Sequence, residues 1–154
     1  MSMTEGVFSP PTPINEAVKS YAPGSPERAS IRAKLEEMAA QTWTLPHVIN
    51  GQKSTVGSPE NVIMPHDHQK VIGRFHNADK TTINSAFDAA NDAHHEWAST
   101  SWEDRAAVFL KAAELLAGPW RDEMNASTML GQAKTVHQAE IDAACELIDF
   151  WRYN

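Results

Sequence analysis

The chain has 154 residues, enough for one ordinary domain with a hydrophobic core, and its 42% apolar and 21% charged residues are typical of a globular protein. Its net charge of -7, with no cluster of lysine and arginine, argues against a nucleic-acid partner, and no apolar run is long enough to cross a bilayer. Residues 1–13 show neither a signal-peptide nor a mitochondrial presequence pattern, and the single cysteine, Cys145, fits a reducing compartment. We therefore expect a cytoplasmic protein, with a matrix protein whose presequence has been removed as the alternative.

The first half of the chain predicts an extended arm, one helix and a small β region. Residues 1–24 are rich in proline and lack hydrophobic periodicity, which predicts an arm that either wraps a surface or is disordered. Ser25 and Pro26 are typical of a helix N-cap and first helical position. Asn50-Gly51 favours a hairpin turn. Between about residues 45 and 75 we expect strands over 45–49, 62–64 and 71–75, with a turn over 65–69.

From residue 79 onward, four helices are predicted by their caps and their apolar spacing. The first three open at Asp79, at Ser101 with Asp104, and near Pro119, and the last spans about 136–153 after Thr135 and Gln138. Gly118 and Gly131 are expected to end the second and third helices. Apolar faces are predicted at Ile83, Phe87, Ala90, Ala93 and Trp97, then at Ala106, Phe109, Leu110, Ala113 and Leu116, and finally at Ala143, Leu147, Phe150 and Trp151.

Histidines do not form a metal-binding pattern. His66 and His68 have no third ligand at a suitable spacing, and His94 and His95, adjacent on a helix, point about 100° apart. We therefore predict no metal site, although a small metal-binding protein remains an alternative interpretation.

Two further features also have simple structural interpretations. Cys145 is expected to be a structural thiol, because its acidic neighbours would raise its pKa rather than activate it. Residues 131–135 (GQAKT) lack the second glycine and the preceding strand of a phosphate-binding loop, and are predicted to form a corner between two helices.

An acidic stripe is predicted on the last helix. Asp142, Glu146 and Asp149 occur at i, i+4 and i+7, which places them on one face of an α-helix. Such a stripe is usually solvated, and the alternative is that one carboxylate lines a pocket and meets a cationic group of a ligand.

Four segments together resemble the δ-1-pyrroline-5-carboxylate dehydrogenases, members of the aldehyde dehydrogenase superfamily. They are residues 23–28 (PGSPER), 110–119 (LKAAELLAGP), 128–135 (TMLGQAKT) and 138–150 (QAEIDAACELIDF). The resemblance extends over essentially the whole chain after Pro13. It implies an α/β parent fold, of which this mostly helical segment would be the N-terminal part.

The resemblance also implies a function. The family oxidises L-glutamate γ-semialdehyde to L-glutamate with NAD in proline breakdown, through a cysteine thiolate and a water-activating glutamate. Those groups and the nucleotide-binding loop are expected downstream of residue 154, so we predict no catalytic, cofactor-binding or metal-binding residue here and no activity of this chain alone. One family position carries over: Glu146 resembles a residue of the substrate tunnel, where a carboxylate would meet the substrate's ammonium group.

The sequence therefore predicts a truncated segment with an arm over 1–24 and part of an NAD-binding domain over 25–154. The complete enzyme is expected to be a homo-oligomer acting on a small-molecule substrate, with no membrane or nucleic-acid partner. We expect exposed apolar surface on the segment itself. The alternative is a stand-alone helical interaction module.

Overall fold

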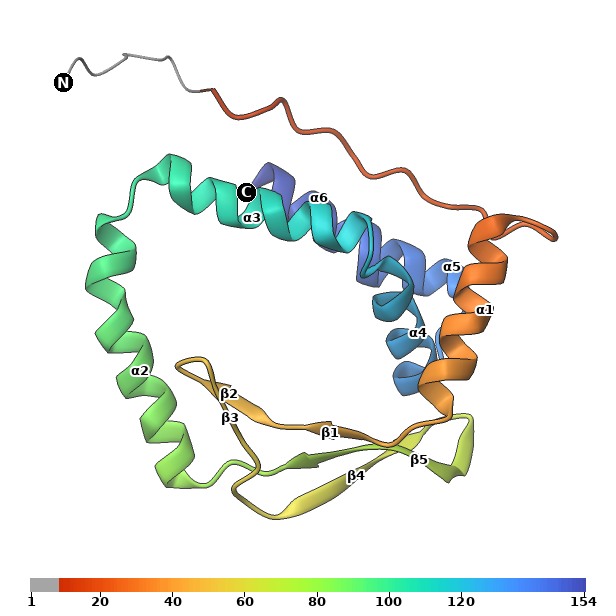
Figure 1. The fold of residues 1–154 in the computed structure, drawn as a ribbon, viewed down its shortest axis with the longest axis horizontal. Helices are drawn as coiled ribbons and strands as arrows, with labels where there is room; N and C mark the ends of the chain where they lie inside the picture. The colour runs from red at the N-terminus through yellow and green to blue at the C-terminus, as the bar shows by residue number, and fades with distance from the viewer. Residues whose placement is uncertain (1–8) are drawn as a thin grey trace.

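The computed structural model describes residues 9–154, so the first eight residues of the predicted arm lie outside the described part. Residues 9–24 form no helix or strand, and they run along the outside of the last helices (Figure 1). Helix α1 (Pro26–Ala39) follows, and Ser25 accepts a hydrogen bond from the backbone N–H of Arg28, which confirms the predicted cap.

The β region is small, as predicted, but its strands are divided differently. β1 (Trp43–Leu45), β5 (Asp67–His76) and β4 (Pro59–Met64) form a three-stranded sheet in that spatial order, with β1 parallel and β4 antiparallel to β5. β2 (His47–Ile49) and β3 (Gln52–Ser54) form a separate hairpin. Asn50 and Gly51 have φ angles of 48° and 72°, the positive values that a tight hairpin turn requires.

Two details of the predicted β region are wrong. The strand expected over 45–49 is interrupted at Pro46, which has no backbone N–H for a ladder hydrogen bond, so its two halves join different sheets. The turn expected over 65–69 contains only residues 65 and 66, and β5 begins at Asp67. Gly73 of β5 allows close packing there, because a Cβ atom would lie 3.2 Å from the Trp43 carbonyl oxygen.

The first two helices after the sheet begin at the predicted caps. Asp79 caps α2 (Lys80–Ser99), and Ser101 caps α3 (Trp102–Ala117), which ends at Gly118. No residue of α2, a helix that lies wholly in the described part of the chain, is buried, and Figure 1 shows it standing apart from α3, α4 and α6. The predicted stripe of α2 is therefore exposed, with Phe87 at 63% exposure. This confirms the expected exposed apolar surface.

The following corner differs slightly from its prediction. Helix α4 (Arg121–Gln132) continues through Gly131, and the residue that reverses the chain is Ala133, with a left-handed φ of 55°. Thr135 and Gln138 then form the predicted capping box at α5 (Val136–Gln138).

The last helical run reaches Tyr153, but its centre is a π-helix. The segment η1 (Ala139–Cys145) separates α5 from α6 (Glu146–Tyr153), and the N–H of Glu146 donates to the carbonyl oxygen of Ile141, five residues earlier. Leu147 and Trp151 of the predicted apolar face are partly buried, as expected, but the extra residue of the π-helical turn moves the centre of that face. Ala144, Cys145 and Ile148 are buried, whereas Phe150 is 58% exposed.

Two hydrophobic clusters hold these elements together. One joins the arm, α1, the sheet and α4, and the other joins α3 to the last helical run. Their buried members are Tyr21, Ile31, Met38, Met64, Ile72, Ala126 and Leu130 in the first, and Ala113, Leu116, Ala144 and Ile148 in the second. Phe109, predicted to face inward on α3, is instead 46% exposed. Among the residues described, no helix is long and apolar enough to cross a membrane.

Candidate functional site

Glu146 is the first residue of α6, directly after the π-helical turn. Its side chain is exposed, and within residues 9–154 its carboxylate has no hydrogen-bond or ion-pair partner. The helical turn that presents Glu146 is thus of a rare type that occurs frequently at functional sites.

The other two carboxylates of the predicted stripe are engaged by this chain itself. Asp142 forms a 2.7 Å ion pair with Lys134, in the corner before α5. Asp149 accepts 2.7 Å hydrogen bonds from the side-chain amide of Asn15 and from the backbone N–H of Glu16, both in the arm. The three residues therefore do not act as one solvated stripe, and Glu146 is the member left available for a ligand.

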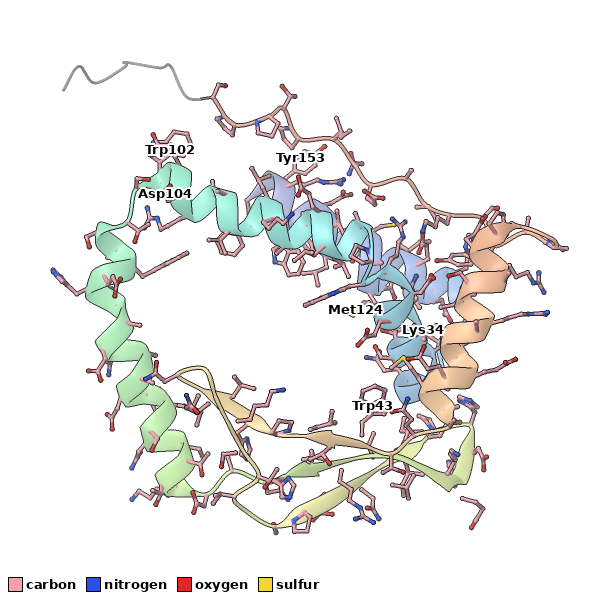
Figure 2. The ribbon with its side chains drawn as sticks, in the orientation of Figure 1. Lys34, Trp43, Trp102, Asp104, Met124 and Tyr153 are labelled. Carbon is pink, nitrogen blue, oxygen red and sulfur yellow. The ribbon has the colours of Figure 1, made fainter. Side chains whose placement is uncertain are left out.

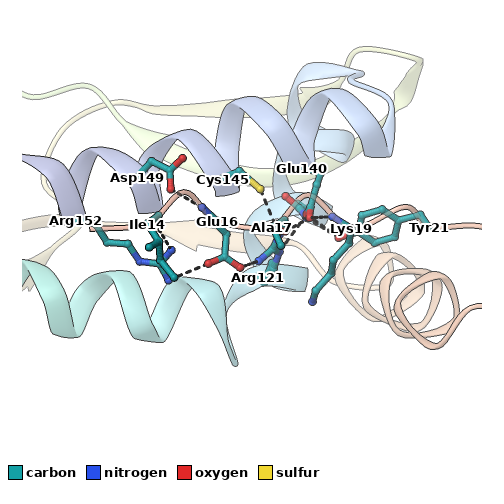
Figure 3. Close-up of polar contacts among 11 residues, drawn as sticks. Ile14, Glu16, Ala17, Lys19, Tyr21, Arg121, Glu140, Cys145, Asp149 and Arg152 are labelled. Atoms are coloured by element: carbon teal, nitrogen blue, oxygen red, sulfur yellow. Dashed lines mark hydrogen bonds and ion pairs between the residues drawn. The ribbon is translucent and has the colours of Figure 1, made fainter. Parts of the chain in front are cut away.

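A buried polar cluster lies beside the same turn, and Figure 3 shows its contacts. At its centre is Glu140 of η1, which is fully buried. Its carboxylate accepts hydrogen bonds from the Asn125 amide at 2.7 Å, from the Tyr21 hydroxyl at 2.8 Å and from the Lys19 backbone N–H at 2.8 Å. Arg121, also buried, donates to both oxygens of this carboxylate through Nε and Nη2. Every donor reaches Glu140 from the arm or from α4.

Arg121 connects this centre to the rest of the arm. Its Nη1 pairs with Glu16 at 2.5 Å and its Nη2 donates to the Ala17 carbonyl oxygen at 2.7 Å. Glu16 pairs in turn with Arg152 of α6 at 2.8 Å. Negative and positive groups therefore alternate in the order Glu140, Arg121, Glu16 and Arg152, so the buried charges are compensated.

The pKa values of the cluster follow from this arrangement. Burial opposes ionisation of Glu140, but hydrogen bonds from Arg121, from the Lys19 backbone and from Tyr21 outweigh it and lower its pKa to about 2. Burial and the neighbouring Glu140 carboxylate raise the pKa of Tyr21 well above its usual value. At neutral pH the cluster thus contains an ionised Glu140 and a Tyr21 hydroxyl that keeps its proton.

Sequence patterns did not identify Arg121, Glu140, Asn125 or Tyr21. Glu140 resembles an ordinary acidic residue in the first turns of a helix, and Tyr21 precedes it by 119 positions. The one signal in the sequence is that Arg121 and Glu140 each lie near apolar helix positions. This does not reveal that both residues contact the arm.

Cys145 lies against this cluster and is 5% exposed, with its sulfur 3.3 Å from Arg121 Nη2. Burial raises its pKa to about 11, although the nearby Arg121 cation opposes the rise. The thiol is therefore protonated at neutral pH, in agreement with the structural role predicted for it.

No other part of the described chain offers a reactive constellation. An apolar hollow of about 370 Å³ lies between α4 and the sheet, with Trp43 and Met124 on opposite sides (Figure 2), and Glu123 is the one charged residue among those that line it. Within residues 9–154, no group of three or more His, Cys, Asp or Glu side chains is placed to hold a metal ion.

Comparison with known proteins assigns a family to this arrangement. Residues 52–154 match the aldehyde dehydrogenase family. The chain is 46% identical, over 95% of its length, to the δ-1-pyrroline-5-carboxylate dehydrogenase of Agaricus bisporus, and 44% identical over 91% of its length to the mitochondrial enzyme of that name from Mus musculus. It spans 27% and 25% of those two proteins.

A solved structure shows the same likeness. The NAD-bound δ-pyrroline-5-carboxylate dehydrogenase of Mycobacterium tuberculosis superposes with a TM-score of 0.94 and 48% identity. The superposition covers 97% of this chain and 28% of that one.

Proposed function

The chain belongs to the aldehyde dehydrogenase family, and from this we propose that it is the N-terminal part of an enzyme that oxidises L-glutamate γ-semialdehyde to L-glutamate with NAD, in proline breakdown. The observation that carries the proposal is the 48% identity and TM-score of 0.94, over nearly the whole chain, to a dehydrogenase of δ-pyrroline-5-carboxylate. In this reaction, water supplies the second carboxylate oxygen and a hydride leaves the aldehyde carbon for NAD.

Glu146 is proposed to bind the substrate's α-ammonium group. Support comes from its exposure at the end of the π-helical turn and from the absence of a partner within residues 9–154, whereas Asp142 and Asp149 are already paired. A carboxylate without a hydrogen-bond or ion-pair partner among the described residues is available for a charge-assisted hydrogen bond with an ammonium group.

We assign no NAD contacts to this chain, because neither of two candidate connections has the form of a dinucleotide-binding loop. The corner over residues 131–135 joins two helices, rather than a strand and a helix. The connection from β5 to α2, residues 77–79, contains no glycine, and the Asp79 carboxylate already occupies the helix N-terminus, where it would repel a phosphate.

The catalytic thiol is also proposed to lie in another part of the enzyme. Cys145 is buried and has a raised pKa, which disfavours the thiolate that attack on an aldehyde requires. We accordingly expect this chain alone to be inactive. Residues 1–24 would be the arm and residues 25–154 part of the NAD-binding domain of a homo-oligomeric enzyme, which we place in the cytoplasm. Fractionation of cells expressing the tagged protein tests that location.

A hybrid enzyme tests the function. In it, this chain replaces the equivalent segment of the Mycobacterium tuberculosis dehydrogenase, and NADH formation from the semialdehyde is measured with the unaltered enzyme as reference. The hybrid should oxidise the semialdehyde. A folded hybrid that binds NAD but does not oxidise this substrate contradicts the proposal.

Glu146→Gln in the hybrid tests the role of that residue. Loss of the negative charge should raise KM for the semialdehyde about tenfold, the effect of about 1.4 kcal/mol in binding, while KM for NAD stays unchanged. Asp142→Asn is the matched control, because it neutralises another carboxylate of the same helical run whose partner is Lys134. Unchanged kinetics of Glu146→Gln would remove Glu146 from the substrate site.

A further inference from the structure

The arm crosses the π-helical turn and is fastened on both sides of it. Lys19 and Tyr21 donate to Glu140, the second residue of the turn. Asn15 and Glu16 donate to Asp149, which lies beyond the turn in α6. We call residues 15–21 the strap. The arm runs opposite in direction to the helix (Figure 3), and Glu146 lies between Glu140 and Asp149 in the sequence.

The two attachments restrict the direction in which Glu140 and Asp149 point. At about 100° per residue, the nine steps between them would turn an α-helix by about 900°, which places the two side chains on opposite faces. A π-helical turn contains about one more residue than an α-helical one, which reduces this rotation by about 100°. Asp149 then lies within about 80° of Glu140 around the helix axis, so one strap can contact both. The strap therefore favours the π-helical form of η1.

Conversion of this turn to an α-helix would change the direction of Glu146. The N–H of Glu146 donates to Ile141, five residues earlier, and in an α-helix it would donate to Asp142. That change of one residue rotates the following helix by about 100° relative to the preceding one. The carboxylate of Glu146 would then point to a different side.

The strap is held firmly enough to impose this form. Tyr21 is buried, and its backbone is in the left-handed region at φ 50°, a conformation that persists only where surrounding contacts hold it. Its hydroxyl also accepts a 3.0 Å hydrogen bond from Asn125.

We propose that Tyr21 and Asp149 are positioning residues that hold the π-helical turn and thereby direct the Glu146 carboxylate to the substrate. This inference rests on the proposed function for its substrate, but the shape of the turn can be measured without activity. Neither residue contacts the substrate in this proposal, and each acts through the strap.

The test uses Tyr21→Phe and Asp149→Asn in the hybrid enzyme, with Asp142→Asn as the control. Tyr21→Phe removes one donor to Glu140, and Asp149→Asn weakens the other attachment. Each should raise KM for the semialdehyde about threefold, with kcat and KM for NAD unchanged, because the carboxylate is misdirected rather than lost. In the Glu146→Gln background, neither change should alter KM further. The control should match the parent hybrid.

Hydrogen exchange provides a readout that does not depend on catalysis. Peptides covering residues 141–150 should exchange several-fold faster in both strap variants than in the control, because the i→i+5 hydrogen bonds open more often. Unchanged exchange in both variants overturns the inference, whether or not the hybrid is active. Faster exchange with an unchanged KM shows that the strap holds the turn without directing Glu146, and this also overturns it. An inactive hybrid with faster exchange contradicts the proposed function instead, and with it the role in substrate binding.

Discussion

The Tyr21 hydroxyl donates a 2.8 Å hydrogen bond to Glu140, which lies 119 positions later in the chain. The bond joins a segment without regular secondary structure to the π-helical turn. Since Glu140 also accepts from Arg121 and Asn125 of α4, this carboxylate connects the arm, α4 and the last helical run. Its removal should affect all three.

Glu140→Ala should therefore destabilise the protein strongly. The change leaves the buried Arg121 guanidinium without its main partner, and loss of one member of a buried ion pair costs about 3–5 kcal/mol. Urea denaturation of the 154-residue chain measures the change in the free energy of unfolding. Glu114→Ala is the control, because its ion pair with Lys111 is exposed and such a pair contributes about 0–1 kcal/mol. Equal effects of the two changes would show that the buried cluster does not stabilise the fold.

Acid should lower the free energy of unfolding by protonating the same carboxylate, that of Glu140. The pKa of Glu140 is about 2 in the folded chain, below its ordinary value of 4.5, so its contribution to stability is complete above pH 4.5 and is lost as the pH falls toward 2. The free energy of unfolding should decrease over this interval, and less steeply in Glu140→Gln, which has no proton to bind there. Denaturation series at several pH values measure both slopes. Parallel curves for the two proteins would contradict the assignment.

Ala133→Gly should stabilise the chain. Ala133 ends α4 with a left-handed φ of 55°, which costs a residue with a Cβ atom about 1 kcal/mol relative to glycine. Ala40→Gly is the control: Ala40 ends α1 with an ordinary φ of -76°, so glycine there adds only flexibility to the unfolded chain and should lower stability slightly. In thermal denaturation, the melting temperature should rise for Ala133→Gly and fall slightly for Ala40→Gly. A lower melting temperature for Ala133→Gly would show that no strain is relieved.

The predictable parts of this fold are those that short-range rules govern. Ser25, Asp79, Ser101 and Thr135 each accept the hydrogen bond expected of an N-cap, because capping depends on residues within one turn. The hairpin at Asn50 and Gly51 is correct for the same reason. The resemblance in sequence also identified the family.

The unpredicted parts depend on contacts between distant segments. Nothing local in residues 139–145 favours a π-helix over an α-helix, and α-helical spacing consequently predicts Phe150 on the apolar face of the last helix and misses Ile148. The burial of Glu140 likewise depends on donors that arrive from the arm and from α4. Substrate binding by Glu146 stays a prediction, which is supported by its exposure and by the absence of a hydrogen-bond or ion-pair partner among residues 9–154.

The attachment of the arm to the last helical run also affects the order of events during synthesis. Tyr21 leaves the ribosome 119 residues before Glu140, which at about 5–20 residues per second amounts to roughly 6–24 s. During that time the nascent arm has neither Glu140 nor Asp149 to bind. The arm is thus translated well before the residues that it contacts, and a chaperone that binds exposed extended chain has this interval in which to hold it.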